Sequence, residues 1–195
     1  MANYWFCPLY QFQCDSDNMN LEEGIKILRI PREFVEYLER HYSDMLRTIP
    51  STAEWIVSLP FKDFPTVSYL FEDFITALRL YQKGRVVAGL LTSANFNDSE
   101  LTIGGSTIWT SISSIDFFTE ESIYKFRERD VPEVNQLILN IRQWRESRVL
   151  DVINIALERF HSGYHGPIED RLIDQMIAFE YLFLGDVQEL TYKLA

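Results

Sequence analysis

The stretch from Glu169 to Leu184 constrains this chain most, because its apolar residues recur at the spacing of an α-helix. One broad arc of the helical wheel collects Leu172, Ile173, Met176, Ile177, Phe179, Phe183 and Leu184. The other side carries Arg171, Asp174 and Gln175. Glu180, however, lies near the centre of the apolar arc. A buried carboxylate without a partner is costly, so we expect Glu180 to have a partner or to be protonated.

Arg159 is the candidate partner for Glu180. It lies beside the apolar arc of a second helix, which the spacing predicts over residues 149–160. A charge-assisted pair between the two side chains would offset the cost of burying the carboxylate. Such a pair has two interpretations. The cost of burying charge favours a purely structural pair, and the other interpretation is a pair that orients a catalytic group.

The composition is that of a folded, acidic protein. Of the 195 residues, 47% are hydrophobic and 14% are aromatic, which is enough for one sizeable core. The formal net charge of -11 argues against a general polyanion-binding surface, and we expect no DNA partner. Arg142, Arg145 and Arg148 follow one another at three-residue steps. We favour a solvated helix face for them over a small RNA-facing patch.

The cysteines and the N-terminus indicate a reducing compartment. Two cysteines, Cys7 and Cys14, do not make a disulfide framework, so reduced thiols are expected. The first residues lack the basic and apolar regions of a secretory signal. No apolar run reaches the roughly 18 residues of a membrane span. We therefore expect a cytoplasmic protein with no membrane partner.

Residues 1–118 mix strands and helices and predict an α+β fold with a small antiparallel β-meander. Pro8 lacks a backbone donor, so residues 3–14 are predicted as an edge strand. Gly104-Gly105 is predicted as the two-residue turn of a hairpin. The other predicted strands cover residues 24–30, 54–59, 85–92, 101–103 and 106–112, and the predicted helices cover 32–47 and 66–82.

Residues 119–195 are predicted to be helical throughout. N-capping residues and apolar spacing predict helices that begin near 119, at 130–145, at 149–160 and at 169–184. One more helix is expected to begin at 188, and the chain ends in the middle of its pattern. This part is therefore interpreted as the N-terminal piece of a helical domain, and the chain as part of a longer protein.

Residues that could carry chemistry in this chain give no complete site. Arg159 and His165 have an Arg-x(5)-His spacing found in some metal-independent ribonucleases, but glycines and a proline surround His165, so coincidence is the favoured interpretation. His161 and His165 are four residues apart without a third ligand, so no metal site is predicted. We expect no cofactor.

The last third of the chain resembles the Apea-like branch of the HEPN domains. The resemblance is carried by Ala156-Leu-Glu-Arg-Phe160, by Arg171-Leu-Ile-Asp-Gln-Met-Ile-Ala-Phe-Glu-Tyr-Leu-Phe-Leu-Gly185 and by Glu189-Leu-Thr-Tyr-Lys-Leu-Ala195. It is strongest over residues 148–195, about a quarter of the chain, and a weaker similarity reaches Thr76–Gly84.

The resemblance implies a helical bundle, commonly a homodimer, that targets RNA in defence, toxin or RNA-processing systems. It implies a metal-independent endoribonuclease whose Arg-x(4-6)-His motif lies on a later helix, beyond the end of this sequence. No catalytic residue is therefore expected in this chain. Glu180, Arg159, Arg171 and Asp174 would lie near that site in supporting roles. The competing hypothesis is a non-catalytic interaction or dimerisation module, with an aromatic-rich N-terminal part that binds a protein or ligand.

Overall fold

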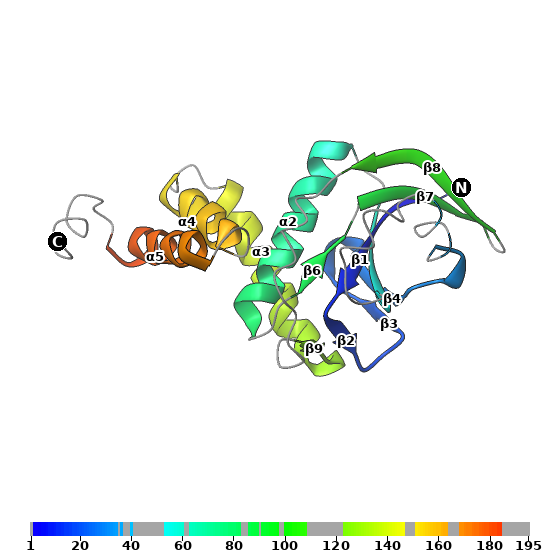
Figure 1. Ribbon diagram of the computed structural model, residues 1–195, viewed down its shortest axis with the longest axis horizontal. Coiled ribbons are helices and arrows are strands. Elements are labelled where there is room, and N and C mark those ends of the chain that lie inside the picture. The colour runs from blue at the N-terminus through cyan, green and yellow to red at the C-terminus, as the bar shows by residue number, and fades with distance from the viewer. Residues whose placement is uncertain are drawn as a thin grey trace. The chain divides into compact units, whose positions relative to one another are not determined.

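The structure is a computed structural model that describes residues 2–34, 36, 40, 53–60, 63–82, 86–89, 91–97, 100–108, 123–146, 151–163 and 168–184. Within them the chain forms both helices and antiparallel strands, which confirms the mixed α+β class (Figure 1). Two compact units divide the chain, one of residues 1–138 and one of residues 139–195. The first unit therefore extends past the predicted limit at residue 118.

A seven-stranded antiparallel sheet forms the centre of the first unit among the described residues. Its order is β3 (Asn18–Asn20), β4 (Lys26–Arg29), β5 (Trp55–Pro60), β1 (Ala2–Tyr10), β7 (Leu91–Asn97) and β8 (Glu100–Ile108), and β6 (Val87–Ala88) also pairs with β1. The strands predicted at 24–30 and 54–59 correspond to β4 and β5. Between Asn20 and Lys26 lies the short helix η1 (Glu22–Gly24).

The edge position predicted for β1 is wrong, because β1 lies between β5 and β7. Pro8 is tolerated there because, on the side of β1 opposite β5, the neighbouring strand changes from β7 to β6 at this point. Pairing with β7 ends at Phe6, and pairing with β6 begins at Leu9. In this interval the carbonyl oxygen of Pro8 accepts a hydrogen bond from the Gly89 N–H at 2.8 Å. The missing N–H of proline therefore interrupts no pairing with β7 or β6.

The hairpin turn predicted at Gly104-Gly105 is also wrong. Strand β8 runs through both glycines, and the β7–β8 connection lies between Asn97 and Glu100, which are register partners. Glycine in a strand interior is compatible with an irregularity, and the register between these strands shifts between Thr92 and Ala94. The single strand predicted at 85–92 is instead divided between β6 and β7.

Helix α2 (Phe64–Tyr81) matches the helix predicted at 66–82 and contacts β5 of the sheet (Figure 1). Asp63 caps it, since its carboxylate accepts a hydrogen bond from the Thr66 N–H at 3.1 Å. Between Thr66 and Tyr81 only Tyr69 and Leu80 are exposed. The helix is therefore buried around most of its circumference. Of the helix predicted at 32–47, the described residues 32–34, 36 and 40 are helical.

The prediction that the chain is helical throughout from residue 119 is wrong, because residues 124–126 form a strand. Strand β9 (Tyr124–Phe126) pairs in parallel with β2 (Phe12–Cys14). The ring of Tyr124 stacks on Phe12 with centroids 5.7 Å apart, and its hydroxyl donates to the Leu78 carbonyl of α2 at 2.7 Å. These contacts attach β9 to the N-terminal unit, which is why that unit includes residues beyond 118. The predicted helix start near 119 lies outside the described residues.

The start of α3 (Val131–Glu146) is fixed by one buried carboxylate. Asp130 ends the short helix η3 (Glu128–Asp130) and is 6% exposed. Its oxygens accept hydrogen bonds from the Tyr81 hydroxyl at 3.1 Å and from the Arg127 N–H at 2.9 Å. Burial, followed by this hydrogen bond to Asp130, raises the pKa of Tyr81. Asp130 thus connects the end of α2 to the start of α3.

Candidate functional site

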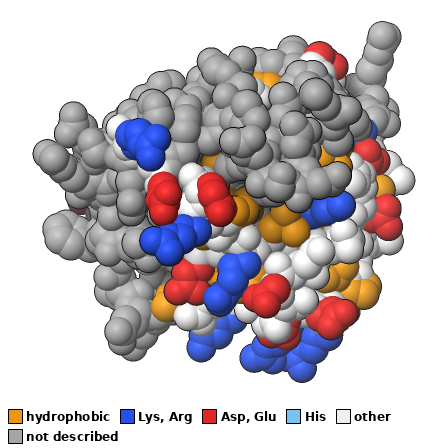
Figure 2. All heavy atoms as spheres, turned by 90° about the vertical axis from the view of Figure 1, so that its right-hand side faces the viewer, with side chains coloured by type: hydrophobic (Ala, Val, Ile, Leu, Met, Phe, Trp, Pro, Cys, Tyr) orange, Lys and Arg blue, Asp and Glu red, His pale blue; other side chains and the backbone are white. Residues whose placement is uncertain are grey.

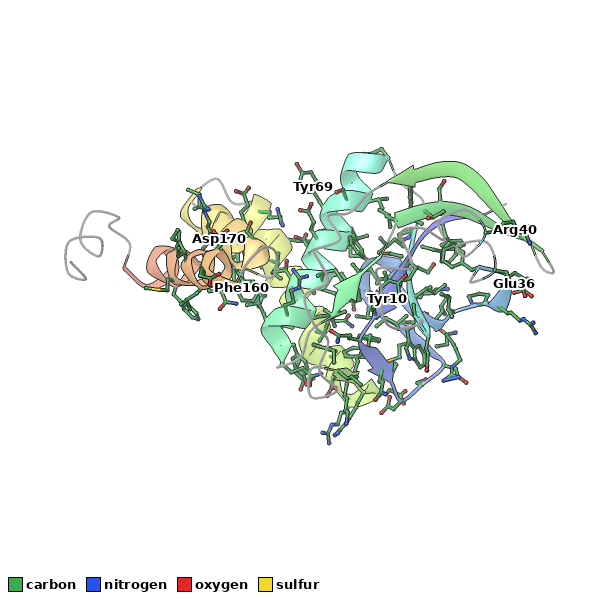
Figure 3. The ribbon with its side chains drawn as sticks, viewed as in Figure 1. Tyr10, Glu36, Arg40, Tyr69, Phe160 and Asp170 are labelled. Atoms are coloured by element: carbon green, nitrogen blue, oxygen red, sulfur yellow. The ribbon has the colours of Figure 1, made fainter. Side chains whose placement is uncertain are left out.

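The residues selected from the sequence lie on two neighbouring helices, α4 (Asp151–Ser162) and α5 (Ile168–Leu184), which match the helices predicted at 149–160 and 169–184. The two helices pack against each other along their length (Figure 3). Ala156 of α4 and Ala178 of α5 are both buried, at 1% and 2% exposed. Leu157 is buried with them.

Arg159 and Asp174 connect the two helices. The Arg159 Nη1 donates to the Asp174 Oδ1 at 2.9 Å. The Arg159 side chain is 50% exposed and the Asp174 side chain 18% exposed, so the pair lies at the edge of the helix–helix contact rather than in a core. An ion pair in this setting contributes roughly 1 kcal/mol or less to stability.

Two of the four supporting residues are thus brought together, and the other two are not described. Arg159 was expected to reach Glu180, and its described partner is Asp174. The backbone of Glu180 and Arg171 belongs to α5, but their side chains lie outside the described residues. The proposed Arg159–Glu180 pair therefore stays a prediction. The side chains of His161, His165 and Arg148 also lie outside the described part.

Four large apolar side chains of the α5 arc are exposed rather than packed against α4. Leu172 is 59% exposed, Ile173 54%, Met176 49% and Phe179 58%. The side of α5 that is turned toward α4 instead carries Asp174 and Ala178. Arg159 and Asp174 form an ion pair between the two helices, and Ala156 and Ala178 are buried.

Exposed apolar residues on α5 form a seam with coiled-coil spacing. Leu172 and Met176 are four residues apart, and Met176 and Phe179 are three apart. The same alternation continues in the sequence to Phe183, whose side chain is not described. This spacing lets side chains of one helix insert between those of a facing helix. We call Leu172, Ile173, Met176 and Phe179 the α5 apolar seam.

On the face of the molecule seen in Figure 2, the charged side chains of the described residues form no comparable surface. Figure 2 shows Lys and Arg side chains mixed with Asp and Glu side chains on one face, without a continuous patch of one sign. Among the described residues, no group of three or more His, Cys, Asp or Glu side chains is arranged to hold a metal ion. Arg142 and Arg145 of α3 are half-buried rather than projecting as a basic surface.

No described helix is both long enough and apolar enough to cross a membrane.

Comparison with known proteins gave no match to a protein-family model, to a curated protein or to a solved structure. The candidate site is chosen from the structure alone: it is the pair of helices α4 and α5 with the exposed α5 apolar seam.

Proposed function

We propose that this chain is an interaction protein that self-associates through the α5 apolar seam, so that α5 of one copy packs against α5 of another. The observation that supports this proposal is the exposure of four large apolar side chains on one face of one helix. Single exposed apolar residues are ordinary on protein surfaces, whereas a contiguous row of them marks an interaction site.

A second copy of the chain fits this seam because the seam is complementary to itself. In a twofold-symmetric pair the same surface is used by both copies, so an apolar row with heptad spacing meets an equivalent row. Met176 is the middle residue of Ile168–Leu184 and would lie at the symmetry axis. Methionine adapts its shape well at such a position.

The charges on α5 favour an antiparallel pair. Glu169 and Asp170 occupy the first turn of the helix. In a parallel pair these acids from both copies would lie side by side. In an antiparallel pair centred on Met176 they lie toward opposite ends, about 20 Å apart along the helix axis. That separation is about two and a half Debye lengths at physiological salt, so the repulsion between them is screened.

The proposal is tested by sedimentation of the full chain over a range of concentrations. We expect a concentration-dependent mass that approaches twice the 23.0 kDa of one chain. Because each copy carries a net charge of -11, added salt should screen their repulsion and strengthen the association. A single species of 23.0 kDa at all concentrations and salt levels would contradict the proposal.

Engineered cysteines, introduced after Cys7 and Cys14 are replaced by serine, test the orientation. A disulfide requires Cα atoms within about 7 Å. In the antiparallel pair Met176→Cys places both thiols at the axis and should cross-link. Leu172→Cys places them about 12 Å apart along the helices and should not. Efficient cross-linking of Leu172→Cys would indicate a parallel pair instead.

RNA targeting of the HEPN type is a second candidate, and it comes from the resemblance. It is supported by the contact between Arg159 and Asp174, two of the four residues that the resemblance puts near the family's active site. In this candidate function RNA is the ligand of the helical part.

We expect the 195-residue chain to leave single-stranded RNA intact, because it is predicted to contain no catalytic pair. The measurement is gel analysis of labelled RNA after incubation with purified protein. Cleavage that disappears in His165→Ala would show that this prediction is wrong. Binding by charge contacts would weaken with salt, which separates it from self-association through the apolar seam.

A further inference from the structure

Met176 is the member of the α5 apolar seam that mild oxidants can modify. Its thioether sulfur is readily oxidised to a sulfoxide, which is polar and chiral. The other three members, Leu172, Ile173 and Phe179, carry hydrocarbon side chains that the same reagents leave unchanged. Met176 is 49% exposed, so a reagent in solution reaches it in the single chain. Oxidation would therefore place a polar group in the middle of an apolar surface.

Met19 is protected from such reagents by the first unit. It is the middle residue of β3 and is 3% exposed. Its Sδ accepts a hydrogen bond from the thiol of Cys14 at 3.4 Å. Met19 is therefore a buried counterpart of Met176 in the same chain. The other two methionines, Met1 and Met45, lie outside the described residues.

The position of Met176 in the seam makes its oxidation state matter to the contact between copies. Leu172 precedes it by four residues and Phe179 follows it by three, so the seam continues on both sides of it. In the antiparallel pair, residue 176 of one copy meets residue 176 of the other at the symmetry axis. One oxidised residue in each chain thus brings two sulfoxides together. This inference rests on the proposed self-association through the seam.

We propose that oxidation of Met176 by a peroxide switches the self-association off. Hydrogen peroxide transfers one oxygen atom to the Met176 Sδ: the O–O bond breaks, an S–O bond forms, and the rest of the peroxide leaves as water. The sulfur loses two electrons, which the peroxide gains. In the free chain water hydrates the sulfoxide oxygen, whereas the hydrocarbon side chains of a facing seam offer it no donor. The oxidised chain therefore favours the monomer.

The switch can be reversed, and association protects the chain from it. Methionine sulfoxide reductases restore the thioether with electrons from a dithiol, and the sulfoxide oxygen leaves as water. When two copies pack through the seam, residue 176 is covered at the axis, so the peroxide reacts with the free chain. The rate of oxidation at Met176 should therefore fall as the protein concentration rises.

Sedimentation velocity of the full chain before and after treatment with hydrogen peroxide tests the switch. Mass spectrometry of peptides locates the added oxygen, which we expect at Met176 and not at Met19. Once Met176 is oxidised, the dissociation constant should rise at least about tenfold, because a polar group without a partner is buried in the contact. Reductases for both sulfoxide epimers should restore the original value. Circular dichroism checks that the oxidised chain stays folded.

Matched variants separate Met176 from the other sulfur residues. Met176→Leu has no sulfur at this position, so its dissociation constant should be the same with and without peroxide. Any effect of oxidation at Cys7, Cys14 or Met45 would still appear in this variant. Met19→Leu keeps the volume of a buried residue and should respond to peroxide as the unchanged chain does.

The outcomes distinguish the switch from the association itself. A chain with the sulfoxide at Met176 that associates as strongly as the untreated chain would overturn the switch and leave the proposed self-association in place. Equal weakening of Met176→Leu by peroxide would assign the effect to another residue and overturn the switch as well. A chain that is monomeric before oxidation would overturn both.

Discussion

Met176→Glu should abolish the proposed self-association and leave a monomer. In an antiparallel pair both copies contribute residue 176 at the symmetry axis, so the substitution places two carboxylates next to each other in an apolar contact. Each would lose hydration without gaining a partner, and the two would repel. We expect the dissociation constant to rise at least 100-fold, which corresponds to about 2.8 kcal/mol.

The measurement is sedimentation velocity on the variant beside the unchanged chain, with two controls. Met176→Leu keeps an apolar side chain of similar volume and should keep the association. Gln143→Glu adds the same negative charge at an exposed position of α3 and should also keep it. If Met176→Glu associates as strongly as Gln143→Glu, the seam is not the contact between copies, and another partner must be sought for it.

Local sequence pattern predicted many elements of this fold, because periodicity and capping residues are local signals. The amphipathic spacing from Thr66 to Gln82 predicted α2, which begins two residues earlier at Phe64, and a short apolar run before Pro60 predicted β5. The predictions were wrong where residues distant in the sequence determine the local structure. Pro8 is tolerated in a central strand because Gly89, far along the chain, lies opposite it. Tyr124 is held in a strand by contacts with Phe12 and Leu78.

In the candidate site, too, local features were predicted and contacts between helices were not. Apolar spacing predicted the α5 helix and its apolar arc, and it also identified Arg159 as a residue with an interhelical role. It did not show which side of α5 faces α4. The contact between the helices is marked by the pair of Arg159 and Asp174 and by the buried Ala156 and Ala178, which the pattern of large apolar residues does not reveal.

Pairing of Cys14 with Met19 could not be predicted from spacing alone. Five residues separate them, a distance that has no special meaning in either a helix or a hairpin. Their contact depends on β3 pairing with β4 and on β2 pairing with β9, which comes from residue 124 onward. The number of cysteines indicates only that no disulfide framework is present, whereas in the structure the Met19 thioether lies next to Cys14.

Tyr124 is the residue whose loss should cost the first unit most. Its side chain is fully buried, its ring stacks on Phe12 at 5.7 Å, and its hydroxyl donates to Leu78 at 2.7 Å. Its backbone N–H also donates to the Gln11 carbonyl at 2.7 Å. One side chain therefore joins β9, β2 and α2, three elements that are distant in the sequence.

Tyr124→Ala should lower the free energy of unfolding by about 3–5 kcal/mol, because it leaves a cavity and removes the stacked ring. Tyr124→Phe keeps the ring and loses only the hydrogen bond to Leu78, so about 1 kcal/mol is expected. Tyr69→Ala removes the same side chain from an exposed position of α2 and should cost less than about 1 kcal/mol. Urea unfolding is measured by tryptophan fluorescence, to which the buried Trp5 and Trp55 of the sheet contribute. If Tyr124→Ala costs no more than Tyr124→Phe, the aromatic contact between β9 and β2 does not stabilise this unit, and the attachment of β9 depends on its backbone pairing alone.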